Sequence, residues 1–124
     1  MLQSEKELME IQLKERRECT VRVGGYCMKP EILDGAEITI RSVPAGEMNP
    51  GEIAAYFVGA NLFVHRLIAK GAATLTMRAD NLRPDLHEVP AGAVLGRVVG
   101  IKNPSFLERT AKKIRRRLKI LKTK

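Results

Sequence analysis

The amino-acid sequence predicts a mainly β protein, in which one curled, partly closed sheet has a short helix at each end. Three observations predict this fold class. Short runs with β-branched residues alternate with Gly, Pro and Asn, turn sequences join several of these runs, and both ends of the chain carry helical patterns. The 124 residues can bury one modest core, and a composition that is 44% hydrophobic but only 4% aromatic indicates an aliphatic core.

Residues 1–19 are predicted to form an N-terminal helical segment. Ser4 and Glu7 have the spacing of a capping box, in which each side chain satisfies a backbone amide of the first helical turn. The polar start does not match a signal peptide, and the chain has no apolar run of about 18 to 20 residues that could span a bilayer. We therefore expect a cytoplasmic protein, with a peripheral position on the inner face of the membrane as an option.

Residues 20–101 are predicted to form the β domain. Residues 59–61 would join two strands as a hairpin, and residues 70–72 would make the next turn. Consecutive strands joined in this way predict a β-meander that curls into a compact sheet. Six strands are expected, over residues 20–23, 36–42, 52–58, 61–69, 73–77 and 93–99.

Residues 102–124 are predicted to form a basic amphipathic helix. Pro104 precedes a second capping box, made by Ser105 and Glu108. Apolar residues then recur at steps of four and three, which places them on one helical face. They are Leu107, Ala111, Ile114, Leu118 and Leu121.

The positive charge of the chain is confined to this last segment. Residues 101–124 carry ten Lys or Arg and one Glu, a net charge of +9, whereas the whole chain carries +8. Such a helix could bind an anionic membrane surface or nucleic acid, or it could pack on the sheet or on a partner. The regular apolar stripe favours membrane over nucleic acid. The residues expected to bind the anionic surface are Lys112, Lys113, Arg115, Arg116, Arg117 and Lys119.

A cysteine in a glycine-preceded turn is the main candidate for chemistry. Gly24 and Gly25 before Cys27 permit backbone angles that other residues resist, and Pro30 restricts the exit of the turn. A thiol becomes a nucleophile as the thiolate, which a neighbouring imidazole such as that of His65 favours. The alternative is structural, because a free Cys is often a buried apolar residue.

Several short motifs around Cys27 and His65 occur in an order that supports a catalytic role for these two residues. They are Gly24-x-x-Cys27-Met28-x-Pro30, Asp34-Gly35 before Ala36-Glu37-Ile38-Thr39-Ile40, Pro50-Gly51-Glu52-Ile53, Val64-His65-Arg66-Leu67, Ala79-Asp80-Asn81, and Leu95-Gly96-Arg97-Val98-Val99-Gly100. Over about residues 21–101 this order resembles the signal peptidase I and LexA-type peptidase clan. The resemblance implies a curled β domain with peptidase activity, the nucleophile at position 27 and the base at position 65.

Two positions differ from the usual pattern of that clan. Its nucleophile is serine, where this chain has Cys27. Its base is lysine in bacterial members and histidine in the endoplasmic-reticulum and archaeal type, so His65 followed by Arg66 is closer to the histidine branch. A histidine can ionise a thiol once an ion pair forms, so Cys27 and His65 are chemically consistent.

Two further elements of a catalytic site are expected. An acidic residue would orient His65, with Asp85 as the first choice and Asp80 as the second, although Asp in such turn-rich segments often only caps turns. Backbone amides of the Cys27 turn would stabilise an oxyanion, and the candidates there are Gly25, Tyr26 and Met28. His87 is predicted to be a solvated loop histidine.

The sequence therefore predicts a small cytosolic peptidase that cleaves a dedicated peptide or precursor protein. The alternative is an inactive relative that uses the same fold to bind a peptide or a membrane. No Cys and His spacing suggests a zinc site and no phosphate-binding loop is present, so no metal and no cofactor are expected. The lack of a membrane anchor in the sequence argues against a general signal peptidase, and LexA-type self-cleavage lacks a DNA-binding domain to release.

Overall fold

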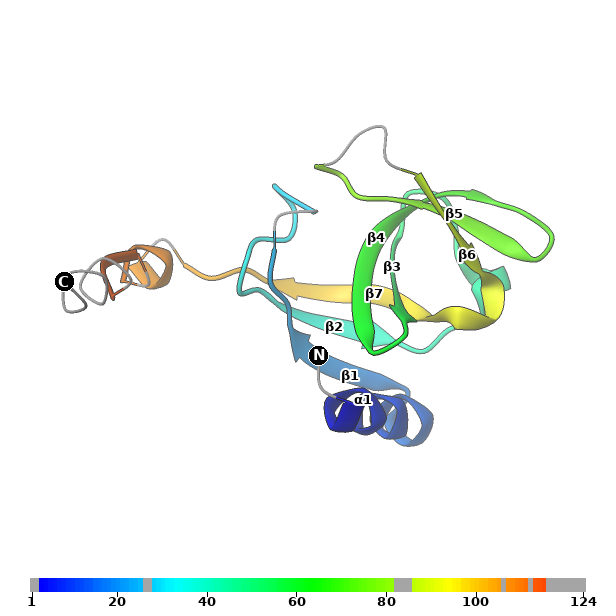
Figure 1. Ribbon diagram of the computed structural model, residues 1–124, viewed down its shortest axis with the longest axis horizontal. Helices are drawn as coiled ribbons and strands as arrows, with labels where there is room; N and C mark the ends of the chain where they lie inside the picture. The colour runs from blue at the N-terminus through cyan, green and yellow to red at the C-terminus, as the bar shows by residue number, and fades with distance from the viewer. Residues whose placement is uncertain (1–2, 26–27, 82–85, 106, 112, 116–124) are drawn as a thin grey trace.

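One antiparallel sheet, curled into a half-barrel, makes up most of the protein (Figure 1). The computed structural model describes residues 3–25, 28–81, 86–105, 107–111 and 113–115, and the statements below concern these residues. The sheet within them comprises β1 (Glu18–Arg22), β2 (Glu37–Arg41), β3 (Ile53–Val58), β4 (Asn61–Lys70), β5 (Thr74–Arg78), β6 (Leu86–Pro90) and β7 (Val94–Lys102). Helix α1 (Gln3–Arg16) precedes the sheet, and two 3-10 turns, η1 (Ala45–Glu47) and η2 (Ala91–Ala93), lie in its connections. The mainly β prediction is confirmed.

The order of strands in the sheet is β1-β2-β7-β3-β4-β5-β6. All six expected strands form, and β3 to β6 follow one another as a meander. The meander prediction is wrong for β7, which returns to pair with both β2 and β3. This pairing joins strands that are far apart in the sequence, so no turn sequence predicts it. As a result β7 joins the part of the sheet that holds β1 and β2 to the part that holds β3 and β4.

Strand β6 was not predicted. Its residues follow a segment of turn formers, and four of its five side chains are exposed, so they lack the alternation that marks a half-buried strand. Pairing with β5 makes it a strand, in a register that runs from Thr74 opposite Pro90 to Arg78 opposite Leu86.

Helix α1 lies against β1 and covers one end of the sheet (Figure 1). It buries Met9 and Leu13, and its Lys6 donates to the backbone oxygen of Gly59 at 2.8 Å. The helix begins at Gln3, so Ser4 lies inside the first turn rather than at the expected cap. It occupies most of the segment that was predicted to be helical.

The buried residues form two adjacent clusters. The first lies among α1, β1, β2, the loop after position 27 and part of β3, and it contains Ile38 and Ile40. The second lies among β3 to β6 and contains Leu67 and Met77. The core is therefore mostly aliphatic, as expected from the composition. In the described part of the chain, His65 is the one buried residue with a charged or strongly polar side chain.

The C-terminal segment begins with the expected capping box. The Oγ of Ser105 accepts the N–H of Glu108 at 3.1 Å, and the carboxylate of Glu108 accepts the N–H of Ser105 at 3.4 Å. Residues 107–111 and 113–115 are helical and lie well away from the sheet (Figure 1). None of the helices that the structure describes has the length and apolar character that a bilayer crossing requires.

Candidate functional site

A pocket of about 520 Å³ separates the end of β1 from the first half of β4. Four segments of the chain line it: helix α1 through Glu5, the end of β1 with the turn after it, the loop after position 27 through three apolar residues, and the first half of β4. The lining residues are Glu5, Arg22, Val23, Gly24, Gly25, Met28, Ile32, Leu33, Asn61, Leu62, Phe63, Val64 and His65. The predicted base therefore shares one pocket with residues on both sides of the predicted nucleophile, although they lie far apart in the sequence.

Three of the predicted site residues lie outside the described residues. They are Cys27, Tyr26 and Asp85. Their roles as nucleophile, oxyanion group and acid stay predictions, and the site is built below from the residues around them.

The turn before position 27 is held by its own backbone and by Asp34. Gly25 has a φ of 96°, in the region that favours glycine, and its N–H donates to Oδ1 of Asp34 at 3.0 Å. Gly35 donates to the oxygen of Val23 at 2.8 Å on the other side of the same loop. Because the Gly25 amide is engaged with Asp34, Gly25 contributes to the pocket as a wall rather than as an oxyanion donor.

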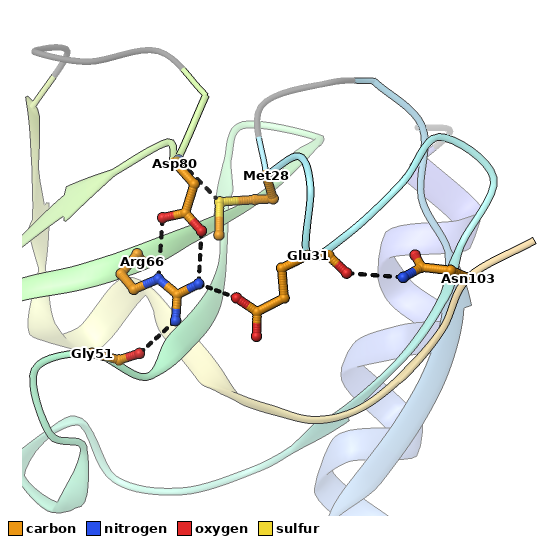
Figure 2. A network of polar contacts seen from close by, with 6 residues as sticks. All are labelled: Met28, Glu31, Gly51, Arg66, Asp80 and Asn103. Carbon is orange, nitrogen blue, oxygen red and sulfur yellow. Dashed lines mark hydrogen bonds and ion pairs between the residues drawn. The ribbon is translucent and has the colours of Figure 1, made fainter.

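Met28 continues the wall of the pocket on the far side of the turn. It is buried, and its sulfur lies 3.4 Å from the backbone nitrogen of Asp80 (Figure 2). This contact ties the residue after position 27 to the end of β5. The predicted oxyanion role of the Met28 amide stays a prediction.

His65 is enclosed on β4 by three rings. The hydroxyl of Tyr56 on β3 lies 2.8 Å from its Nδ1, and Tyr56 is only 2% exposed. The ring of Phe63 lies 5.8 Å away, and that of His87 stacks at 5.6 Å with 16° between the planes. The predicted loop position of His87 is wrong, because it lies on strand β6, but it is exposed as expected. Pairing in the sheet brought it to the site.

Tyr56 was not predicted as a site residue. The two-residue hairpin between β3 and β4 places Tyr56 opposite Phe63 and hence diagonal to His65 on the same face. The register of this hairpin, counted outward from the turn at residues 59–60, is the sequence signal that could have found it.

Asp80 pairs with Arg66 rather than with His65 (Figure 2). Its Oδ1 accepts from Nε of Arg66 at 3.1 Å and its Oδ2 from Nη2 at 2.7 Å. Arg66 follows His65 on a strand, and successive side chains point to opposite faces of a sheet. The second-choice assignment of Asp80 as the group that orients His65 is therefore not supported by the geometry. Asp80 was taken from its position in the motif, which does not specify the face.

Arg66 is the centre of a polar network that reaches four segments. Besides Asp80, it contacts Glu31 and donates to the oxygen of Gly51 at 2.7 Å (Figure 2). Asn103, beyond β7, donates to the oxygen of Glu31 at 2.9 Å. The hydrogen bond to Asp80 raises the pKa of Arg66, so the guanidinium stays charged in this partly buried place. The network fixes the loop after position 27 against β4 and β5.

A second ion pair joins two more of the motifs. Nη1 of Arg97 on β7 lies 2.8 Å from a carboxylate oxygen of Glu52, and this hydrogen bond lowers the pKa of Glu52. The Pro-Gly-Glu-Ile and Gly-Arg-Val-Val-Gly segments thus meet in the fold. The ion pairs of Arg66 and Arg97 therefore connect motifs that lie far apart in the sequence.

The described residues give little support for a metal site or for a second nucleophile. Among the described residues, no group of three or more His, Cys, Asp or Glu could hold a metal ion. Cys19 is buried beside β2, and burial raises the pKa of its thiol, so it is a poor nucleophile.

Comparison with known proteins does not identify a family. No protein-family model matches the chain, and no curated protein matches it. The functional argument therefore rests on the motifs and on the geometry of the pocket.

Proposed function

We propose that this protein is a peptidase similar to signal peptidases, which cleaves a dedicated peptide or precursor protein in the cytoplasm. The observation that carries the proposal is the shared pocket, because His65 and the residues flanking Cys27 line it together. A catalytic dyad needs its base within reach of its nucleophile. The ion pairs that join the motif segments add support, because they hold both sides of the pocket in place.

The proposed reaction is acyl transfer through a thioester. The sulfur of Cys27 attacks the peptide carbonyl carbon while His65 takes the thiol proton. His65 then gives this proton to the leaving amine, which breaks the C–N bond. Water, activated by the same imidazole, hydrolyses the thioester and returns the thiol. The motifs predict Asp85 as an acidic residue beside His65, at a position outside the described residues.

An extended peptide would bind beside β4 as an added strand. In the described chain, β5 pairs with β4 only from Arg66 onward, so the first half of β4 has β3 on one side and the pocket on the other. The backbone N–H and C=O of Leu67 bond toward the β3 side. Since these directions alternate along a strand, those of Leu62 and Val64 point toward the pocket. The resemblance implies small substrate residues nearest the scissile bond.

The thiol chemistry can be tested without a known substrate. We expect iodoacetamide to alkylate Cys27 with a midpoint below pH 8, because His65 stabilises the thiolate, and the midpoint to rise to about 8.5 in His65→Ala, the value of an ordinary thiol. Peptide mapping by mass spectrometry follows each cysteine separately. Cys19 is the internal control, since burial raises the pKa of its thiol and should keep it slow in both proteins. Identical Cys27 titrations in the two proteins would refute the dyad.

Cleavage itself separates the peptidase from a binding module. Wild type incubated with a defined peptide library should produce new termini that Cys27→Ala does not, whereas Cys27→Ser tests whether a hydroxyl can replace the thiol. Peptides that bind but stay intact would favour the inactive relative.

A second proposal concerns the basic C-terminal helix, which we infer binds an anionic membrane surface. The observation behind it is exposure, since Leu107 is 78% and Ile114 is 52% exposed on a helix that stands away from the sheet. Lys113 and Arg115 are also exposed on this helix. The other candidate residues, Lys112, Arg116, Arg117 and Lys119, lie outside the described part. An exposed apolar stripe beside basic residues suits an interfacial helix.

Deleting residues 105–124 should abolish binding to vesicles that contain phosphatidylserine. The sheet should stay folded, because β7 ends at Lys102 and Asn103 remains to hold Glu31. Binding of the full chain should weaken with salt, since exposed charges are screened over about 8 Å at physiological ionic strength. Sedimentation with vesicles measures both effects, and neutral vesicles are the control. A truncated protein that unfolds or precipitates would instead indicate that the stripe packs on protein, and stronger binding to a DNA duplex would favour nucleic acid.

A further inference from the structure

The hydrogen bond between Tyr56 and His65 is the most enclosed polar contact of the site. The two atoms lie 2.8 Å apart, and both residues are buried, with exposed fractions of 2% and 5%. A neutral imidazole carries one N–H, and the partner of one ring nitrogen decides which nitrogen keeps the hydrogen. The partner of Nδ1 therefore bears directly on which nitrogen of His65 can act as a base.

We propose that Tyr56 is the positioning residue of the site, accepting the Nδ1–H of His65 and so directing Nε2 to the proton transfer with Cys27. The inference rests on the proposed peptidase reaction. Protonated His65 always carries a hydrogen on Nδ1, and it donates that hydrogen to Tyr56. If neutral His65 keeps the same hydrogen bond, Nε2 gains and loses the proton without any rearrangement of the buried pair.

The surroundings keep the hydroxyl of Tyr56 in place. Its ring belongs to the second core cluster, with Leu67 and Met77, and stacks on Phe63 at a centroid distance of 5.7 Å. Phe63 and His87 also contact the ring of His65, so the imidazole is bounded by rings on several sides. A Tyr56→Phe variant removes one oxygen from this packed group and leaves the ring contacts unchanged.

The described partner of Nδ1 is a phenol rather than a carboxylate. Asp80, the second-choice acid, binds Arg66 through both carboxylate oxygens. Among the described residues, Glu5 and Arg22 are the charged ones that line the pocket with His65. Tyr56 would thus take the orienting role that the sequence assigned to Asp85, and a phenol does so without the full charge of a carboxylate. We therefore expect Tyr56→Phe to slow Cys27 alkylation at neutral pH by about tenfold, below the range of about 10² to 10⁴ typical of a general base itself.

Nitrogen-15 NMR of the full chain, labelled at histidine, tests the tautomer directly. The chain has two histidines, and a His87→Gln sample assigns their signals. Wild-type His65 should show the Nδ1–H form once it is neutral, and Tyr56→Phe should show a mixture of both tautomers. Phe63→Leu is the matched control, because it removes a ring contact but keeps the hydroxyl, and it should retain the wild-type tautomer.

Two results would overturn the role of Tyr56. One is an Nε2–H tautomer in wild type, a result that does not depend on the folding of Tyr56→Phe. The other is a Tyr56→Phe protein with the wild-type spectrum and the wild-type rate of Cys27 alkylation. His65→Ala separates this inference from the reaction on which it rests: if Cys27 reacts equally well without His65, the peptidase reaction is refuted, whereas the NMR result still decides the tautomer.

Discussion

A Gly96→Ala variant is expected to lose about 3 kcal/mol or more of its unfolding free energy, at the upper end of overpacking effects. A Cβ on Gly96 would lie 2.0 Å from the backbone oxygen of Arg41 and 2.7 Å from its carbonyl carbon. Both atoms belong to the backbone of β2, so no side chain can move aside. Only a shift of β7 against β2 would relieve the contact. Since β7 connects the two walls of the pocket, the variant should also lose Cys27 reactivity where it remains folded.

Gly92→Ala is the matched control for this substitution. A Cβ on Gly92 would meet no atom within 4 Å, and its φ is not positive. This change should leave stability unaltered or raise it by up to about 1 kcal/mol through the unfolded state. Urea unfolding followed by circular dichroism measures both variants. Similar midpoints for the two would mean that β2 and β7 approach less closely than described.

Arg66→Gln is expected to cost about 2 to 3 kcal/mol, because it leaves a partly buried carboxylate without its partner. The side chains of Arg66 and Asp80 are only 22% and 15% exposed, and their two hydrogen bonds are lost together. The contact with Glu31 is lost as well, so the loop after position 27 should become looser. Hydrogen exchange of residues 28–33 should accelerate more than that of α1.

Arg22→Gln provides the control for an ordinary surface ion pair. Arg22 and Glu37 are 69% and 41% exposed, and pairs of this kind contribute about 0 to 1 kcal/mol. A double-mutant cycle that combines Arg66→Gln with Asp80→Asn isolates the coupling between those two residues. Equal effects of Arg66→Gln and Arg22→Gln, with no coupling in the cycle, would show that the network around Arg66 does not stabilise the loop.

Local signals predicted most of the elements. The turn at residues 59–60 and the strands beside it depend on neighbours in the sequence, and so does the capping box of Ser105 and Glu108. These features need few long-range contacts, which explains why the sequence alone indicates them. Strand β6 depends on hydrogen bonds from β5 rather than on its own pattern, and it was missed.

The site residues show the same difference between what local motifs indicate and what strand pairing decides. The motifs predicted Cys27 and His65 as a catalytic pair, and the structure adds that described residues on both sides of position 27 share a pocket with His65. Asp80 was assigned to His65 from its position in a motif. In the structure it binds Arg66, whose side chain points to the opposite face of β4 from that of His65. Tyr56 and His87 carry no motif, and only strand pairing brings them to His65.

By itself the sequence determined the fold class, six of the strands, the cap of the last helix and the residues that define the candidate chemistry. The tertiary structure decided the place of β7, the existence of β6 and the partners of His65 and Asp80. Periodicity, turns and caps arise from contacts between near neighbours in the chain, so they can be read locally. The order of strands and the face on which a side chain lies follow from non-local pairing and burial, which only the folded chain specifies.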